Sequence, residues 1–247
     1  MAHQPTFAYS LYEEKHRQYD LHLWYDIFID QYADPSAVAA EYAAVEGVLA
    51  AEPIYRIAQK GIIEDFVAEQ SGAGTAPFND PEFVKQWSYE NDGSLKEVVA
   101  DVDIDITETW KITTGNSNVI VCVIDDGVDF THADLAANMW RNPDEIAGNG
   151  VDNDENGFNF VTKYGEIIPG DHGALVAGII AAANNNGIGV SGIAGGNGSG
   201  NGVRIMSAQT FRWASSVSAG SAYVYAADNG VVIAQGSWRY SVAGIQK

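Results

Sequence analysis

The chain has 247 residues, of which 33 are acidic and 13 basic, giving a formal net charge of −20. Nucleic acid and anionic membrane surfaces are therefore poor partners, because both are negatively charged. No apolar stretch approaches the roughly 20 residues of a membrane span, and the N-terminus lacks the basic and apolar regions of a signal peptide. With one cysteine, Cys122, no internal disulfide can form, and this residue is expected to be buried.

The first 70 residues have the pattern of a small α+β domain. Residues 21–30 alternate imperfectly between apolar and polar side chains, as a half-buried strand would. An alanine-rich helix is expected over residues 35–44, with Ser36 as its cap. Residues 48–57 form a second extended segment. The sequence thus predicts a strand–helix–strand unit at the N-terminus.

A linker of small residues, SGAGTAP at 71–77, is the best domain boundary. The predicted domains are therefore residues 1–70 and residues 78–247. The Gly-rich stretch 195–202 lies within the second domain. Because it lacks the Lys-Ser/Thr ending of a phosphate-binding loop, it is expected to be a flexible surface loop.

The second domain contains a short apolar run at 119–124, VIVCVI, followed by Asp125, Asp126 and Gly127. Such a run predicts a central strand of a parallel sheet that is covered on both faces. In open α/β sheets, ligands and chemistry gather beyond the carboxyl ends of the strands. A carboxylate at that place orients a histidine, holds a metal or binds a sugar hydroxyl.

A helix is predicted from residue 171, with Asp171 as cap and His172 in the first turn. Ala177 and Gly178 are expected to let it lie close to the sheet. An aspartate at a strand end followed by a histidine at a helix start is one order in which serine-hydrolase triads are arranged.

Both segments resemble motifs of the subtilisin-like serine peptidases (subtilases). VIDDGVDFTHADL is similar to the aspartate motif V-I-D-[ST]-G-[IV], and DHGALVAG is similar to the histidine motif H-G-T-H-V-A-G. The segments VRIMSAQTF and YAADNGVVIAQGSW resemble subtilases of Bacteroidetes-like bacteria. The resemblance implies an α/β fold in which a parallel-sheet subtilisin-like domain, truncated here, follows a small α+β propeptide-like domain. That propeptide would assist folding and cover the active site.

In a subtilase-like triad, His172 would be the general base and Asp125 would orient and stabilise its imidazole. Asp126 is the rival carboxylate and stands where the family usually has Ser or Thr. Whether Asp126 raises a neighbouring pKa or binds a cation is left open. Ala174 and Leu175 replace the threonine and second histidine of the motif.

Residues 231–235 are predicted to be another buried strand, which ends at Gly236, Ser237 and Trp238. This segment resembles the subtilase strand that pairs with the substrate backbone and closes in S-x-G. The three residues are therefore candidates for binding a peptide or protein substrate. Arg239 replaces the glycine, and its side chain would crowd the groove.

No counterpart of the family's serine motif, G-T-S-M-[AS]-x-P, occurs before Lys247. Ser221 lies within a predicted helix, 217–229, that Gly230 ends. Ser237 belongs to the substrate strand. The chain is therefore expected to be an N-terminal fragment of a secreted or cell-surface bacterial endopeptidase precursor, inactive as it stands. The alternative is a degenerate, non-catalytic module that binds or inhibits.

Asp152, Asp154 and Asn156, followed by Gly157, match the first half of a calcium-binding loop. The second half does not match, because Lys163 stands where a bidentate Glu is wanted. A Ca²⁺ site and a solvated acidic turn therefore both remain possible interpretations. No organic cofactor is expected.

Overall fold

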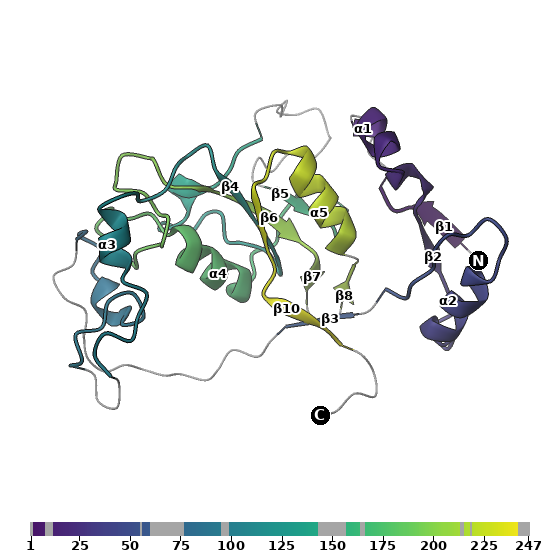
Figure 1. The fold of residues 1–247 in the computed structure, drawn as a ribbon, viewed down its shortest axis with the longest axis horizontal. Helices are drawn as coiled ribbons and strands as arrows, with labels where there is room; N and C mark the ends of the chain where they lie inside the picture. Colours follow the sequence, from purple (N-terminus) through teal and green to yellow (C-terminus); the bar gives the residue numbers. More distant parts are fainter. Residues whose placement is uncertain are drawn as a thin grey trace.

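The computed structural model describes residues 2–7, 12–54, 56–59, 77–94, 99–142, 157–163, 166–212, 215–217 and 219–241. Within them the architecture is α/β, as the sequence predicted. A four-stranded parallel sheet has one helix packed on each face, and three two-stranded antiparallel pairs lie outside it (Figure 1). No helix in these ranges has the length and apolar character needed to cross a bilayer.

The elements preceding the sheet lie within the first 110 residues. They are β1 (Ala2–Pro5), α1 (Glu13–Gln18), η2 (Leu21–Leu23), β2 (Tyr25–Phe28), α2 (Pro35–Ala43), β3 (Arg56–Gln59), η3 (Phe83–Lys85) and α3 (Ile106–Trp110). The remaining elements build the sheet and its surroundings. They are β4 (Ile120–Asp125), η4 (Ala136–Asn138), β5 (Gly157–Asn159), α4 (Asp171–Ala181), β6 (Arg204–Gln209), β7 (Phe211–Arg212), β8 (Ser215–Ser216), α5 (Ala219–Asp228), β9 (Ile233–Gln235) and β10 (Trp238–Ser241).

Strand β4 is central in the sheet, whose order is β5-β6-β4-β9. Successive residues of a strand point to opposite faces. Cys122 and Ile124 accordingly pack in the cluster that includes the alanines of α5, whereas Val121 and Val123 pack in the cluster that includes Ala177 of α4. The predicted central strand, covered on both faces, is confirmed. Burial raises the pKa of the Cys122 thiol to about 12, so this thiol is a core residue.

Strand β9 is shorter and more exposed than the sequence predicted. It pairs in parallel with β4 through Ile233, Ala234 and Gln235. Ile233 is nevertheless 52% exposed, and Val232 just before it is 66% exposed. The prediction of a buried strand is wrong here because, among the described residues, β9 is the outer strand of the sheet and pairs on one side only.

The segment after α4 is anchored by residues from the start of the second predicted domain. Asp80 is buried, and its carboxylate accepts hydrogen bonds from the backbone N–H groups of Asn185 and Asn186 and from the Ser191 hydroxyl. Helix α4 ends at Ala181, so these asparagines lie in a loop beyond the helix. The 78–94 region thereby packs beneath the carboxyl end of α4.

The Gly-rich stretch 195–202 is a loop, as expected, but only its tip is exposed. Gly195 and Gly196 are buried. Their carbonyl groups accept hydrogen bonds from the side-chain amides of Asn138 and Asn184, respectively. The base of the loop is therefore held by buried amides.

The N-terminal elements follow the predicted order of strand, helix and strand as β2, α2 and β3, but β2 pairs with β1 and β3 with β10 rather than with each other. Residues 21–30 contain η2 followed by β2, and β2 pairs with β1 in an antiparallel manner outside the main sheet. The cap of α2 is Asp34, whose carboxylate accepts from the N–H of Ser36, so the expected cap Ser36 is wrong. Strand β3 pairs antiparallel with β10. The end of the second predicted extended segment therefore lies in β3, which pairs with the strand that begins at Trp238.

Helix α1 contacts the end of α5, which lies beside it in Figure 1. His16 is buried, and its Nε2 lies 2.7 Å from Oδ2 of Asp228, the last residue of α5. Lys15 Nζ lies 2.8 Å from the other carboxylate oxygen. A buried carboxylate is costly unless it is paired, so this contact fixes where α1 can lie on α5.

Candidate active site

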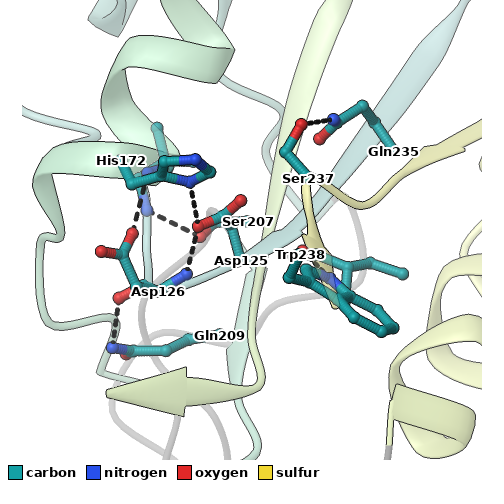
Figure 2. Close-up of polar contacts among 11 residues, drawn as sticks. Asp125, Asp126, His172, Ser207, Gln209, Gln235, Ser237 and Trp238 are labelled. Carbon is teal, nitrogen blue, oxygen red and sulfur yellow. Dashed lines mark hydrogen bonds and ion pairs between the residues drawn. The ribbon is translucent and has the colours of Figure 1, made fainter. Parts of the chain in front are cut away.

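The carboxyl end of β4 brings Asp125 and His172 together (Figure 2). Nδ1 of His172 lies 2.8 Å from Oδ1 of Asp125, whose side chain is fully buried, whereas the imidazole is 14% exposed. The geometry predicted from the sequence, hydrogen-bonding reach at the carboxyl edge of one parallel sheet, is confirmed. The alternation of side chains along β4 accounts for the position of Asp125. It lies two and four residues after Val123 and Val121, so its side chain points to the same face of the sheet, which α4 covers.

Burial raises the pKa of the Asp125 carboxyl to about 6. Hydrogen bonds from the backbone N–H of Asp126 and from His172 oppose this rise, and the nearby charge of Asp126 adds to it slightly. Oδ1 of Asp125 receives both of these bonds, whereas Oδ2 is buried and has no hydrogen-bond partner among the described residues. The carboxylate is therefore held by its Oδ1 atom.

His172 is the second residue of α4, and the helix begins differently from the prediction. The N-cap is Gly170, whereas Asp171 is the first helical residue and makes no capping hydrogen bond, so the expected cap is wrong. The carboxylate of Asp126 accepts the N–H of Gly173 at 2.8 Å instead. This carboxylate does what an N-cap side chain does, from another segment of the chain.

Asp126 thus has a role that the sequence left open. Its side chain caps the helix that carries His172, and its backbone N–H binds Asp125. Its charge is a minor cause of the raised pKa of Asp125. The carboxylate of Asp126 therefore contacts the helix backbone, and the carboxylate that lies within hydrogen-bonding distance of the His172 ring is that of Asp125.

Two glycines allow the β4 end and α4 to approach closely. A Cβ atom on Gly173 would lie 2.5 Å from the carbonyl oxygen of Gly127, and one on Gly127 would lie 2.4 Å from that of Ile168. Gly127 also has φ of 109°, which a residue with a side chain rarely adopts. The expected close-packing glycine, Gly178, has open space around it instead. Ala177, also expected at the contact, is fully buried.

Two polar residues of β6 belong to the site and were not predicted. Ser207 accepts the N–H of Val128 on its hydroxyl oxygen, and the amide of Gln209 binds the backbone of Asp126 and Ile168. Both side chains are fully buried. A signal was present in the sequence, because two polar residues two apart in an apolar strand share one face.

Of the predicted peptide-binding residues, Gly236 and Ser237 lie between β9 and β10, and Trp238 is the first residue of β10 (Figure 2). Gly236 is exposed, and the hydroxyl of Ser237 lies 2.6 Å from the Nε2 of Gln235. The indole N–H of Trp238 donates to the carbonyl of Ile124, 2.8 Å away. This last contact places the start of β10 next to the residue that precedes Asp125.

Ser221 is not near the histidine. It lies on α5, which covers the face of the sheet opposite to α4, and its hydroxyl donates to the carbonyl of Thr6. The sequence assignment of Ser221 as a helix residue is confirmed.

The predicted calcium ligands Asp152, Asp154 and Asn156 lie outside the described residues. Within the described ranges, no group of three or more His, Cys, Asp or Glu side chains is placed to hold a metal ion. The Ca²⁺ site therefore stays a prediction.

Comparison with known proteins identifies the family. A family model described as "Subtilase family" matches residues 116–242, just over half of the chain. Subtilisin-like protease 1 of Plasmodium vivax is 44% identical over 101 residues, which cover 36% of this chain and 16% of that protein. Neuroendocrine convertase 2 of Bos taurus is 34% identical over 116 residues, which cover 46% of this chain and 17% of that protein. The chain thus spans less than a fifth of the length of these curated relatives.

Solved structures of proteases also align with the chain. The serine protease of Aeromonas sobria, in complex with a chaperone, is 26% identical with a TM-score of 0.40, covering 58% of this chain and 22% of that one. A protease from Pseudoalteromonas arctica is 25% identical with a TM-score of 0.39, and the alignment covers 69% of this chain and 47% of that one. The matched region of the family model contains the paired Asp125 and His172. On the strength of that match, the chain belongs to the subtilase family.

Proposed function

We propose that this chain is the N-terminal part of a serine endopeptidase precursor, in which His172 is the general base and Asp125 orients it. The observation that carries the proposal is the 2.8 Å contact between His172 Nδ1 and Asp125 Oδ1 at the carboxyl end of β4. The contact joins a strand-end aspartate to a helix-start histidine, in the order that subtilases use.

This geometry supports proton transfer at the other ring nitrogen. When Nδ1–H donates to Asp125, Nε2 carries the lone pair that accepts a proton from a serine hydroxyl. The same nitrogen returns the proton to the leaving amine of the cleaved peptide bond, and the Asp125 carboxylate stabilises the imidazolium between the two transfers. Because the pKa of Asp125 is about 6, this stabilisation should weaken as the pH falls below 6.

The nucleophilic serine is proposed to come from sequence beyond residue 247. The two candidate nucleophiles within the chain, Ser221 and Ser237, make other contacts. Ser221 lies over the opposite face of the sheet from His172, and the Ser237 hydroxyl oxygen lies 2.6 Å from Gln235 Nε2. The 247-residue chain alone is therefore proposed to be inactive in peptide hydrolysis.

The N-terminal region is proposed to act as an inhibitory propeptide. Strand β10 starts at Trp238, one of the predicted substrate-binding residues, and β3 lies antiparallel to it from Trp238, opposite Gln59, to Ser241, opposite Arg56. An extended peptide binds a strand edge by the same main-chain pairing. Residues 56–59 thus occupy an edge that a peptide substrate would use.

The remaining features of the proposal come from the family resemblance. The protein is proposed to be secreted or displayed at the surface of a Bacteroidetes-like bacterium and to act on peptides or proteins. A Ca²⁺ ion at residues 152–156 is proposed as a structural ion, with oxygen ligands of the kind that calcium prefers.

The test compares this chain with the longer genomic reading frame that contains it. Each purified protein is treated with a fluorophosphonate probe and with an unstructured protein substrate. The longer protein should be labelled at one serine beyond residue 247, and His172→Ala should lower labelling and hydrolysis by at least about 10³-fold. The 247-residue chain should not be labelled.

Two results would overturn the proposal. One is labelling of Ser221 or Ser237 that disappears in His172→Ala, which would place the nucleophile within this chain. The other is a longer protein that folds, binds an extended peptide along β10 and has no probe-reactive serine. That second result would favour a non-catalytic binding or inhibitory module, for which the β3–β10 pairing is the supporting observation.

A further inference from the structure

We infer that Gln209 is a positioning residue, whose side-chain amide sets the separation at which His172 meets Asp125. The inference rests on the proposed function only in giving that histidine–aspartate pair a catalytic role. The pairing itself, and the part that Gln209 has in it, can be measured without any hydrolysis.

Strand register places Gln209 at the site. It is the last residue of β6, directly opposite Asp125 of β4 on one side and Asn159 of β5 on the other. Its side chain is fully buried. Gln209 lies four residues after Ile205 in the same strand, so both side chains point to the face of the sheet that α4 covers.

The amide of Gln209 joins the two segments that carry the pair (Figure 2 shows its contact with Asp126). Nε2 donates to the carbonyl oxygen of Asp126 at 2.6 Å and to that of Ile168 at 3.1 Å, and Oε1 accepts the N–H of Ile168 at 3.0 Å. Asp126 follows Asp125 directly, and Ile168 precedes His172 by four residues. One side chain thus ties the strand end to the lead-in of the helix.

A primary amide has the donors and the acceptor that this junction needs. A carboxylate at the same place could not donate to either carbonyl, and an apolar side chain could make none of the three bonds. The backbone groups of Asp126 and Ile168 would then be buried without these partners, which is unfavourable unless the segments move apart. Movement of the lead-in segment would carry α4 and His172 away from Asp125.

Other contacts also hold the lead-in segment before α4. Arg212 Nη1 donates to the carbonyls of Ile168 and Pro169, and the N–H of Gly170 donates to the carbonyl of Gly127. Gln209 differs from them because it is fully buried and reaches both the segment before α4 and the residue after Asp125. Loss of this side chain should therefore alter the separation of His172 and Asp125.

The readout is the Nδ1–H proton of His172 in the NMR spectrum of the purified 247-residue chain. A hydrogen bond to a carboxylate moves this resonance far downfield, and its disappearance in His172→Ala assigns it. In Gln209→Met, which keeps the volume and removes the amide, the resonance should be lost or move upfield. Gln209→Asn keeps the amide but is one methylene too short to reach both segments, and it should behave in the same way.

The matched control is Asn138→Ala. Asn138 is also buried, and its amide donates to the carbonyl of Ala181 at the far end of α4 and to that of Gly195. Its loss should destabilise the fold and leave the Nδ1–H resonance in place. An unchanged resonance in a Gln209 variant whose amide spectrum shows a folded protein would overturn the inference.

A measurement on the unaltered chain needs no variant. The side-chain Nε2 protons of Gln209 should exchange with solvent at least about tenfold more slowly than those of Gln18, which is exposed on α1, because buried, bonded groups exchange only on opening. Equal exchange rates would show that the amide is not held, and would overturn the inference even if neither Gln209 variant folds.

If Gln209 positions the pair but the proposed peptidase activity is absent, the resonance will respond to Gln209→Met while the longer protein remains unreactive with the fluorophosphonate probe. If the activity is present and Gln209 has no positioning role, the longer protein will be labelled and the resonance will not change. The two proposals therefore fail separately.

Discussion

The indole N–H of Trp238 donates to the backbone carbonyl of Ile124, 2.8 Å away, one residue before Asp125. The β4–β9 ladder has its last pair at Val123 and Gln235. Beyond that pair the side chain of Trp238 binds a β4 carbonyl at the point where the parallel ladder stops. Trp238, which the sequence predicts to bind peptide, therefore also anchors its own segment to the strand that carries Asp125.

Trp238→Phe should destabilise the chain by about 1 kcal/mol, because it removes this hydrogen bond and retains an aromatic ring. The midpoint of urea unfolding measures the change. Trp24→Phe is the control, since Trp24 is 47% exposed and its replacement should have little effect. Equal midpoints for the two variants would show that the indole contact does not stabilise β10.

Gly173→Ala and Gly178→Ala should have opposite effects on stability, although both lie in α4. A Cβ atom on Gly173 would lie 2.5 Å from the Gly127 carbonyl oxygen, so the helix must move away from the Asp125 turn. No atom outside the surrounding helix backbone lies within 4 Å of the Cβ position of Gly178, and alanine there should stabilise the helix by up to about 1 kcal/mol. Thermal unfolding of both variants decides the matter, and destabilisation by Gly178→Ala would contradict the open space around that residue.

The free energy of unfolding of the Asp125→Asn variant, relative to that of the unaltered chain, should rise as the pH rises. The folded-state pKa of Asp125 is about 6 against an ordinary 3.8, so the folded chain holds this proton more tightly than the unfolded chain does. Ionisation between these values therefore favours unfolding, by up to about 3 kcal/mol once the pH is above 6. Asparagine carries no such cost. Urea unfolding at pH 4 and pH 8 measures the difference, and parallel pH curves for the two proteins would rule out a raised pKa.

The His16–Asp228 contact should show strong coupling in a double-mutant cycle with His16→Ala and Asp228→Ala. Both side chains are at least 96% buried, so we expect a coupling energy of about 1–3 kcal/mol. The exposed Arg17–Glu13 pair on the same helix is the control, with an expected coupling below about 0.5 kcal/mol. Coupling no larger than that of the control pair would mean that α1 does not depend on α5 for its position.

The sequence by itself was sufficient to predict the centre of the sheet and the two residues that meet at its edge. Residues 119–124 are uniformly apolar and rich in β-branched side chains, which is a local property, and β4 is found at residues 120–125. Asp125 and His172 follow a strand and start a helix, and parallel strands place their carboxyl ends at one edge. These predictions are correct because the end of a strand and the start of a helix are each set by residues adjacent in the sequence.

Only the tertiary structure decided which groups support that pair. Asp171 has the local pattern of a helix cap. The N–H of Gly173 in the first turn is instead accepted by the carboxylate of Asp126, which lies 47 residues earlier in the chain. Gln209 binds the carbonyl of Asp126 across 83 residues, and β3 pairs with β10 rather than with β2. Propensity and periodicity describe one segment at a time, whereas these contacts depend on the distance between segments after packing. That distance is set by the close approach of Gly127 and Gly173, which no local pattern encodes.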